Sequence, residues 1–391
     1  MLNSDETLSL LRKVDWNFPG STTSEHSVHA LHWFPGNFIP EIPSFLIEIL
    51  SSPGQIVLDP FCGSGTTGVE AIRLGREAIL CDVNSASIQV SKGKLAVMRA
   101  KDRKKALLEI GRELIWTTFG SADFIAGRPV NGRRSPLVSW FHPSTLAQLE
   151  LLWGLIERIQ DPLIRDIGEL VFSDTLFDCA STGGIKTGGG KRRRHHWGWV
   201  ADNVIPKNPA VHDAVGMFRD RLDKTVSVID NLPSSPLSQA SVFRCDARSL
   251  ALGDESVDLV VTSPPYLGMI DYTLSNRLTY LWFDWPLEAE KYHEIGARFR
   301  RRRGNIVAEY LTDMRASLQE MHRCLRAGSY CAIVIGSSRR YSDVVDQLIK
   351  EASSFFSVVW GPVARIPTRR RLSDRRGTEP KEYVCVFQKI A

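Results

Sequence analysis

The stretch QIVLDPFCGSGTT at residues 55–67 decides the fold of this chain. Its first five residues have the apolar pattern of a short buried strand, and the rest forms a glycine turn before the helix-compatible residues 68–74. A second strand pattern at residues 77–82 ends in Asp82, about 20 positions after the glycines. A strand, a glycine turn, a helix and a second strand with an acidic end predict a βαβ unit that binds a nucleoside.

Five further strand patterns extend this unit. They lie at residues 241–246, 258–264, 330–336, 356–360 and 382–387. Because helical patterns separate most of the strands, we expect an α/β fold with one open, mostly parallel, seven-stranded Rossmann-like sheet. Only residues 365–381 lie between the last two strands, without a helical pattern, which predicts an antiparallel hairpin at an edge of the sheet.

The residues between the second and third strands predict a helical insert. Apolar side chains recur with a period of 3.6 after His142-Pro143-Ser144 and after Asp161-Pro162, with proline at each helix start. A third stripe comprises Val211, Val215, Phe218, Leu222, Val226 and Ile229. The glycine-rich residues 181–206 between the last two helices predict a mobile loop. The chain thus divides into residues 1–95, a helical insert at 96–240, and residues 241–391.

The composition excludes several classes of protein. Hydrophobic residues make up 43% of the 391 residues, which is enough for a large core and excludes disorder throughout. The seven cysteines form no C-x-x-C pair, so we expect reduced thiols and no metal site. No run of 18 apolar residues and no signal-peptide pattern occurs, which predicts a soluble, cytoplasmic protein without a membrane segment.

The apolar strand pattern at residues 258–262 ends in Ser263-Pro264-Pro265-Tyr266. Neither proline has an N–H group, and each restricts the residue before it, so the strand must open at this point. Open α/β sheets bind their ligands at the carboxyl ends of parallel strands. This opening presents a hydroxyl, unpaired carbonyl groups and an aromatic face, a set that suits a flat ring carrying an amine.

The glycine turn and the acidic strand ends are the candidate cofactor site. Gly63 and Gly65 let the backbone pass close to a ligand, and the helix that follows offers N–H groups to an anion. Asp82 could bond ribose hydroxyls, and Asp246 could accept from an adenine amine. Without a ligand, the glycine turn could be only a tight connection between strand and helix, and the two aspartates could be exposed caps at the strand ends.

Together these stretches resemble the S-adenosylmethionine-dependent amino-methyltransferases of DNA, which modify cytosine N4 or adenine N6. The cofactor motif of that family resembles residues 59–67, and its catalytic motif resembles residues 262–266. Residues 32–40 (HWFPGNFIP) resemble the segment that walls the family's cofactor pocket. The resemblance covers residues 29–95 and 241–391 but does not cover the helical insert so specifically.

The resemblance implies a role for each motif. Ser263 and the Pro264 carbonyl would accept hydrogen bonds from the amine and aim its lone pair at the sulfonium methyl group, with Pro265 stiffening the turn. Tyr266 would stack on a base swung out of the duplex. Asp271 could bond the base, orient Ser263 or cap the following helix at residues 274–283. The implied cofactor contacts are Phe38, Asp59, Phe61, Gly63, Ser64, Gly65, Thr66, Thr67, Asp82 and Asp246.

Three basic clusters suit a nucleic-acid substrate although the net charge is only +5. They lie at residues 191–196, at 298 with 300–303, and at 369–376. A charge run is often only a solvated face, but clusters around a catalytic edge would attract phosphates in a salt-sensitive way. The candidate DNA contacts are Lys191, Arg192, Arg193, Arg194, Arg301, Arg302 and Arg370.

We therefore expect a site-specific DNA methyltransferase that forms N4-methylcytosine, with a restriction endonuclease as a possible separate partner. Serine at the first catalytic position favours cytosine by family habit, whereas chemically both Ser and Asp accept from an amine, so adenine N6 stays open. Methylation of guanine N2 in RNA is a further alternative. Only about 30 residues precede the first motif, which argues against this alternative. A nucleic-acid-binding module without activity is the alternative from another class. The target sequence and the oligomeric state are left open.

Overall fold

The computed structural model describes residues 4–19, 27–37, 39–119, 136–180, 197–232, 238–336, 340–366 and 382–390. Seven strands form one sheet in the order β3-β2-β1-β4-β5-β7-β6. Their bounds are β1 Ile56–Asp59, β2 Glu77–Asp82, β3 Ala240–Arg244, β4 Val257–Thr262, β5 Leu325–Gly336, β6 Ser357–Arg365 and β7 Glu382–Gln388. The pairs of β1 to β5 are parallel, and β7 is antiparallel to β5 and β6. The predicted sheet and its edge hairpin are confirmed.

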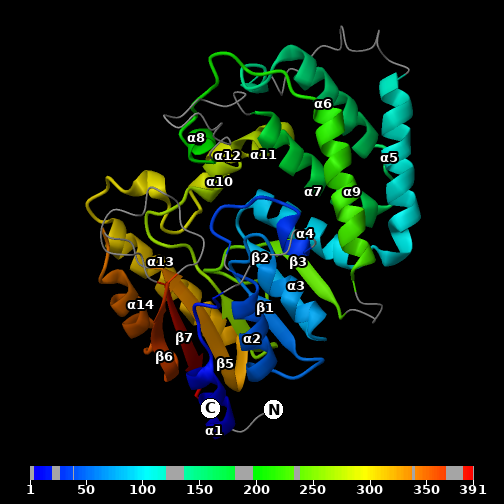
Figure 1. Ribbon diagram of the computed structural model, residues 1–391. Coiled ribbons are helices and arrows are strands. Elements are labelled where there is room, and N and C mark those ends of the chain that lie inside the picture. Colours follow the sequence, from blue (N-terminus) through cyan, green and yellow to red (C-terminus); the bar gives the residue numbers. More distant parts are fainter. Residues whose placement is uncertain are drawn as a thin grey trace.

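Alternation along the strands buries both faces of this sheet. In β5, Ala332 and Val334 belong to one apolar cluster, whereas Cys331 and Ile333 belong to the other. Successive strand residues point to opposite faces, so each face needs its own cover of helices. Figure 1 shows α13 (Ile306–Cys324) and α14 (Val344–Ala352) on one side, and α2 (Glu41–Leu50) and α3 (Thr66–Arg73) on the other. The result is a three-layer α/β sandwich.

The helical insert packs on α4 (Ser85–Met98), the helix that follows β2. Its helices are α5 Lys104–Phe119, α6 Pro143–Ile156, α7 Pro162–Cys179, α8 Trp197–Ala201 and α9 Ala214–Asp230. Gly93 of α4 has no side chain where α7 crosses, and a Cβ added there would lie 2.5 Å from Leu170 Cβ. Only a glycine allows so close an approach of the two helices, so the insert is fitted to the cofactor half of the sheet.

Two predicted features of the insert differ from the structure. The third helix begins at Ala214, because the Asp213 side chain accepts from the Gly216 N–H group, and Val211 lies outside it, 65% exposed. Most of the predicted loop at residues 181–206 lies outside the described residues, but α8 within it is helical and buries Val200.

Short elements cover the carboxyl edge of the sheet. They are α10 Tyr272–Ser275, α11 Arg277–Trp282, α12 Leu287–Lys291 and η4 Arg298–Arg300. Of the other short elements, η1 Val28–Ala30 packs on α4 and η2 Lys101–Arg103 joins α4 to α5, while α1 Ser4–Lys13 lies at the other end of the molecule. The single helix predicted at residues 274–283 is thus two, divided at Asn276. Among the described helices, none has the length and apolarity that crossing a membrane requires.

Candidate active site

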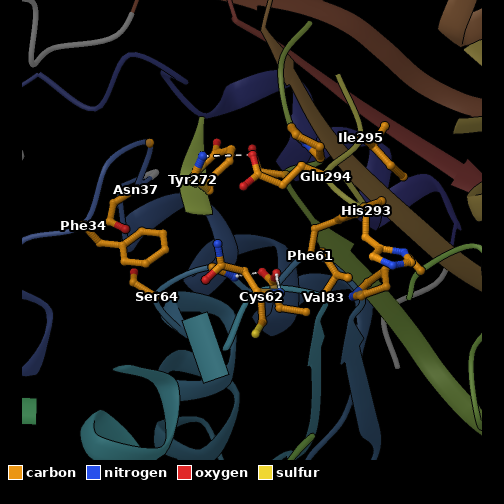
Figure 2. A pocket seen from close by; sticks show the side chains of 18 of the residues that line it. Phe34, Asn37, Phe61, Cys62, Ser64, Val83, Tyr272, His293, Glu294 and Ile295 are labelled. Carbon is orange, nitrogen blue, oxygen red and sulfur yellow. Dashed lines mark hydrogen bonds between the residues drawn. The ribbon is translucent and has the colours of Figure 1, made fainter. Parts of the chain in front are cut away.

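A cavity of about 780 Å³, including the part open to solvent, lies where β1, β2 and β4 end. Figure 2 shows the glycine-turn residues Cys62 and Ser64 across it from Tyr272 and Glu294. It is lined by Phe34, Gly36, Asn37, Pro60, Phe61, Cys62, Gly63, Ser64, Thr66, Asp82, Val83, Asn84, Asp246, Ala247, Ser263, Pro265, Tyr272, His293, Glu294 and Ile295. The sequence patterns on either side of the insert meet in this cavity.

The glycine turn is held open by contacts that need both glycines. Gly63 and Gly65 have φ angles of 50° and 77°, a backbone region that side chains rarely adopt. A Cβ at Gly65 would lie 2.8 Å from Ser91 Oγ, and that hydroxyl donates to the Gly63 carbonyl at 3.1 Å. The Gly63 N–H group donates to Asp82 at 3.0 Å. The turn and the end of β2 are therefore one rigid unit.

The two acidic strand ends in the cavity have different environments. Burial raises the pKa of Asp82 to about 6, and its carboxylate also accepts from the Asn84 N–H group at 2.9 Å. Asp246 is paired with Arg248, whose Nη2 lies 2.6 Å away, and this guanidinium also contacts Asp313. Although burial opposes it, these hydrogen bonds from Arg248 lower the pKa of Asp246.

Asp59 has a different position from the other predicted cofactor contacts. It is 1% exposed and accepts from Thr262 Oγ1 at 2.6 Å and from the Phe61 N–H group at 3.1 Å. Burial raises its pKa to about 6. Because Thr262 is the last residue of β4, this carboxyl group ties the end of the first strand to the start of the catalytic motif.

The Pro-Pro turn is held from both sides. Tyr266 packs against Gly336 at the end of β5, where an added Cβ would lie 2.2 Å from the ring, and its hydroxyl lies 3.3 Å from Ser263 Oγ. From α13, the buried Tyr310 hydroxyl donates to the Pro265 carbonyl at 3.1 Å. Ser263 and Pro265 line the cavity, whereas Tyr266 lies next to them in the turn without lining it.

Two loops lie over the cavity and are joined to each other. The Gly268 N–H group donates to the Gly296 carbonyl at 2.8 Å, and Asp271 accepts from the Phe299 N–H group and from Arg298 Nε at 2.7 and 2.9 Å. Asp271 is therefore used to join the loops, and its side chain does not cap α10. Tyr272, the first residue of α10, lines the cavity close to the Pro-Pro turn in sequence. His293, Glu294 and Ile295 come from the second loop, which carries no recognisable motif, and sequence reasoning missed them as site residues.

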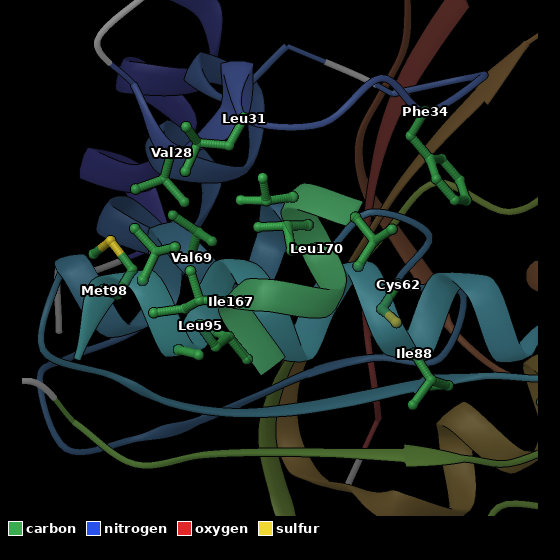
Figure 3. Close-up of a cluster of buried hydrophobic side chains, with 14 of the residues drawn as sticks. Val28, Leu31, Phe34, Cys62, Val69, Ile88, Leu95, Met98, Ile167 and Leu170 are labelled. Carbon is green, nitrogen blue, oxygen red and sulfur yellow. The ribbon is translucent and has the colours of Figure 1, made fainter. Parts of the chain in front are cut away.

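The wall formed by Phe34, Gly36 and Asn37 rests on the helical insert. His32 Nε2 lies 2.9 Å from Ser173 Oγ, and the Trp33 N–H group donates to Asp174 at 2.9 Å, both on α7. The Trp33 ring stacks on Phe177 with centroids 3.7 Å apart. The apolar packing around this wall, with Phe34, Cys62 and Leu170 in one cluster, is drawn in Figure 3.

The predicted contacts divide into three groups. Those that line the cavity are Phe61, Gly63, Ser64, Thr66, Asp82, Asp246, Ser263 and Pro265. Those that lie around it without lining it are Asp59, Gly65, Thr67, Pro264 and Tyr266. Those outside the described residues are Phe38, Lys191, Arg192, Arg193, Arg194 and Arg370.

Some arginines of the basic cluster at residues 298–303 are paired with carboxylates, whereas others are exposed to solvent. Arg298 pairs with Asp271 and Asp202, and Arg303 lies 3.2 Å from Glu309. Arg301 and Arg302 are exposed, and the stem of Arg301 lies over Gly268, where an added Cβ would be 3.1 Å from Arg301 Cγ. Arg301 thus stands beside the loop that follows the catalytic motif.

Comparison with known proteins finds similarity to DNA methylases. A family model described as DNA methylase matches residues 7–93. Type II methyltransferase M.MjaII of Methanocaldococcus jannaschii is 21% identical over 86% of this chain and 78% of its own length, and M.MvaI of Kocuria varians is 23% identical over 69% and 60%.

Two further similarities are weaker or shorter. DNA adenine methyltransferase YhdJ of Escherichia coli is 51% identical over 52 residues, which are 13% of this chain and 18% of that protein. Among solved structures, an S-adenosylmethionine-dependent methyltransferase of Methanosarcina mazei is 10% identical, with a TM-score of 0.34 over 92% of this chain and 99% of that one.

Proposed function

This chain belongs to the S-adenosylmethionine-dependent DNA amino-methyltransferases, and from this we propose that it methylates an exocyclic amine of one base within a specific DNA site. The proposed base is cytosine, modified at N4, and the proposed context is a restriction-modification system. The names of the two long matches, both type II methyltransferases, support that context.

The residues of the cavity fit the cofactor. Gly63, Ser64 and Thr66 line it beside the start of α3, where the N-terminus of a helix favours an anionic group such as the carboxylate of the cofactor. Asp82 would hold the ribose hydroxyls and Asp246 the adenine amine, with Phe61 and Val83 beside the ring. The bound cofactor supplies an electrophilic methyl group on a positively charged sulfur atom.

One observation carries the proposed chemistry: Ser263 lines the same cavity as the glycine turn. An amine that donates hydrogen bonds to Ser263 Oγ and to the Pro264 carbonyl would have its lone pair directed into the cavity. Tyr266, held against Gly336, would stack on the flipped base. Exposed Arg301 and Arg302 would bind backbone phosphates next to this opening.

The proposed base is supported by Ser263 alone. Adenine N6 is the second candidate, and the 51% identity to a DNA adenine methyltransferase over 52 residues favours it. Guanine N2 in RNA is a third, because a similar Pro-Pro-Tyr exit would present any exocyclic amine in the same way.

Mass spectrometry of nucleosides tests the proposal. The protein is incubated with cofactor and with DNA or RNA, the nucleic acid is digested, and the methylated nucleoside is identified. We expect N4-methylcytosine from DNA, no product from Ser263→Ala, and cofactor binding by that variant equal to wild type. Methyladenine, methylguanine or no product would each reject the cytosine assignment.

A further inference from the structure

The cavity contains a third carboxylate, that of Glu294, to which the chemistry above gives no task. Glu294 is 5% exposed and lies on the loop opposite the glycine turn, with its carboxylate beside Tyr272 (Figure 2). One oxygen accepts from the Tyr272 N–H group at 3.0 Å, and the other accepts from the Thr273 N–H group. These two bonds fix the carboxylate in the cavity that Ser263 also lines.

Glu294 differs from Asp246 by its charge balance and from Asp82 by its position, since Asp82 is also held by N–H groups. The charge of Asp246 is compensated by Arg248, and Asp82 lies at the end of β2, where the glycine turn and Asn84 bond it. Glu294 makes no ion pair with any basic side chain in the described part of the chain. A buried carboxylate without a positive partner is costly, and a ligand of positive charge would remove that cost.

The position of Ser263 fixes where such a charge must lie. For an amine held at Ser263 to take the methyl group, the sulfonium has to be in the part of the cavity that Ser263 lines. Glu294 and its partner Tyr272 line the cavity together with Ser263 and Pro265. A fixed negative charge in this cavity stabilises a sulfonium more than a neutral sulfur, and burial of the Glu294 carboxylate strengthens that attraction.

We propose that Glu294 binds the positive sulfonium of the cofactor and so lets the site distinguish the methyl donor from its demethylated product. The inference rests on the proposed function. As the S–CH₃ bond breaks and the N–CH₃ bond forms, the amine gives up a proton to solvent and the sulfur becomes a neutral thioether. Glu294 then has no cation beside it, and the product is released more readily.

The protonation of Glu294 supports this assignment. Burial, together with the Asp271 carboxylate, raises the pKa of Glu294 to about 7 against the hydrogen bonds from Thr273 and Tyr272. The charged and titratable groups around it are Asp271, Tyr272, Tyr280 and, across the cavity, Asp82. Because a cation favours the ionised acid, affinity for the methyl donor should rise with pH from about 6 to 8.

The test compares three ligands on wild type and Glu294→Gln by calorimetry: S-adenosylmethionine, S-adenosylhomocysteine, and sinefungin, whose ammonium replaces the methylsulfonium. We expect the variant to lose about tenfold in affinity for the two cationic ligands, which is one pKa unit of coupling, and to bind the neutral thioether as wild type does. The rise of donor affinity between pH 6 and 8 should also be absent from the variant.

Glu290→Gln is the matched control, since Glu290 is a buried carboxylate 3% exposed that bonds Tyr280 and Ser85 and does not line the cavity. It should affect all three ligands alike. An equal loss of affinity for the three ligands in Glu294→Gln, or no loss, would overturn the inference. The proposed function would still stand in that case, provided that the wild type binds the methyl donor. If wild type binds no donor, the proposed function itself fails.

Discussion

The hydroxyl of Tyr310, on α13, donates a hydrogen bond of 3.1 Å to the carbonyl oxygen of Pro265. The Tyr310 ring can approach because Gly296 has no side chain, and a Cβ there would lie 2.9 Å from the ring. Since both prolines of the turn lack N–H groups, a bond to a carbonyl oxygen is the remaining way for the backbone to be held. Helix α13, which covers one face of the sheet, thus holds the Pro-Pro turn in position.

Tyr310→Phe should lower kcat by about threefold to tenfold, the effect of removing one buried hydrogen bond, with little change in KM for the cofactor. The ring stays and only the bond to Pro265 is removed, so the turn would be held less firmly. Steady-state kinetics checks this. Tyr280→Phe is the control, because it removes a buried hydroxyl that bonds Glu290 instead. Equal decreases of kcat in the two variants would contradict the positioning role.

Gly336→Ala should displace the ring of Tyr266. The φ of Gly336 is not positive, so alanine suits the backbone, and the clash with the ring at 2.2 Å is the main consequence. We expect kcat to fall by about tenfold to a hundredfold, with a smaller fluorescence change from 2-aminopurine placed next to the target base. Gly253→Ala, where an added Cβ has no neighbour within 4 Å, should behave as wild type. Unchanged turnover by Gly336→Ala would show that the ring can lie elsewhere.

Replacing Arg301 and Arg302 together by glutamine should reduce the slope of log K for DNA against log salt by about 2, one unit for each phosphate that an arginine no longer neutralises. Titrations of a fixed duplex at several salt concentrations measure that slope. Arg326→Gln is the control, since Arg326 pairs with Asp258 at the opposite edge of the sheet. If the double variant has the slope of wild type, the two arginines only face solvent.

The fold and half of the cavity could be predicted from the sequence because they depend on local patterns. The glycine turn, the strand ends at Asp82 and Asp246, and the Pro-Pro exit each act through residues adjacent in the chain. The other half could not be predicted, since His293 and Glu294 reach the cavity only through a loop that tertiary contacts hold in place. The sequence also did not predict in which direction a side chain points. Asp59, for example, points into the protein and accepts a hydrogen bond from Thr262.

In the helical insert, too, the sequence did not predict which polar groups would be buried. Its helices were predicted by apolar spacing, but nothing local indicates that α7 would bury Lys94 of α4. Lys94 is 0% exposed and its Nζ has no hydrogen-bond partner in the described structure. Burial lowers its pKa to about 7 from 10.5, although Asp174 opposes the shift. The ammonium form is therefore destabilised in the folded protein.

Lys94→Met should stabilise the fold, most of all at neutral pH. Between about pH 7 and 10.5 the unfolded chain binds a proton at Lys94 that the folded chain does not, so wild-type stability rises with pH in this window. Each pKa unit corresponds to about 1.4 kcal/mol, and the gain from Lys94→Met should shrink as the pH approaches 10.5. Denaturant unfolding of both proteins across this range measures it. Lys92→Met, at an exposed position of the same helix, is the control and should give no such pH-dependent gain in stability. If the gain in stability from Lys94→Met does not change with pH, added apolar packing and not the buried charge is responsible.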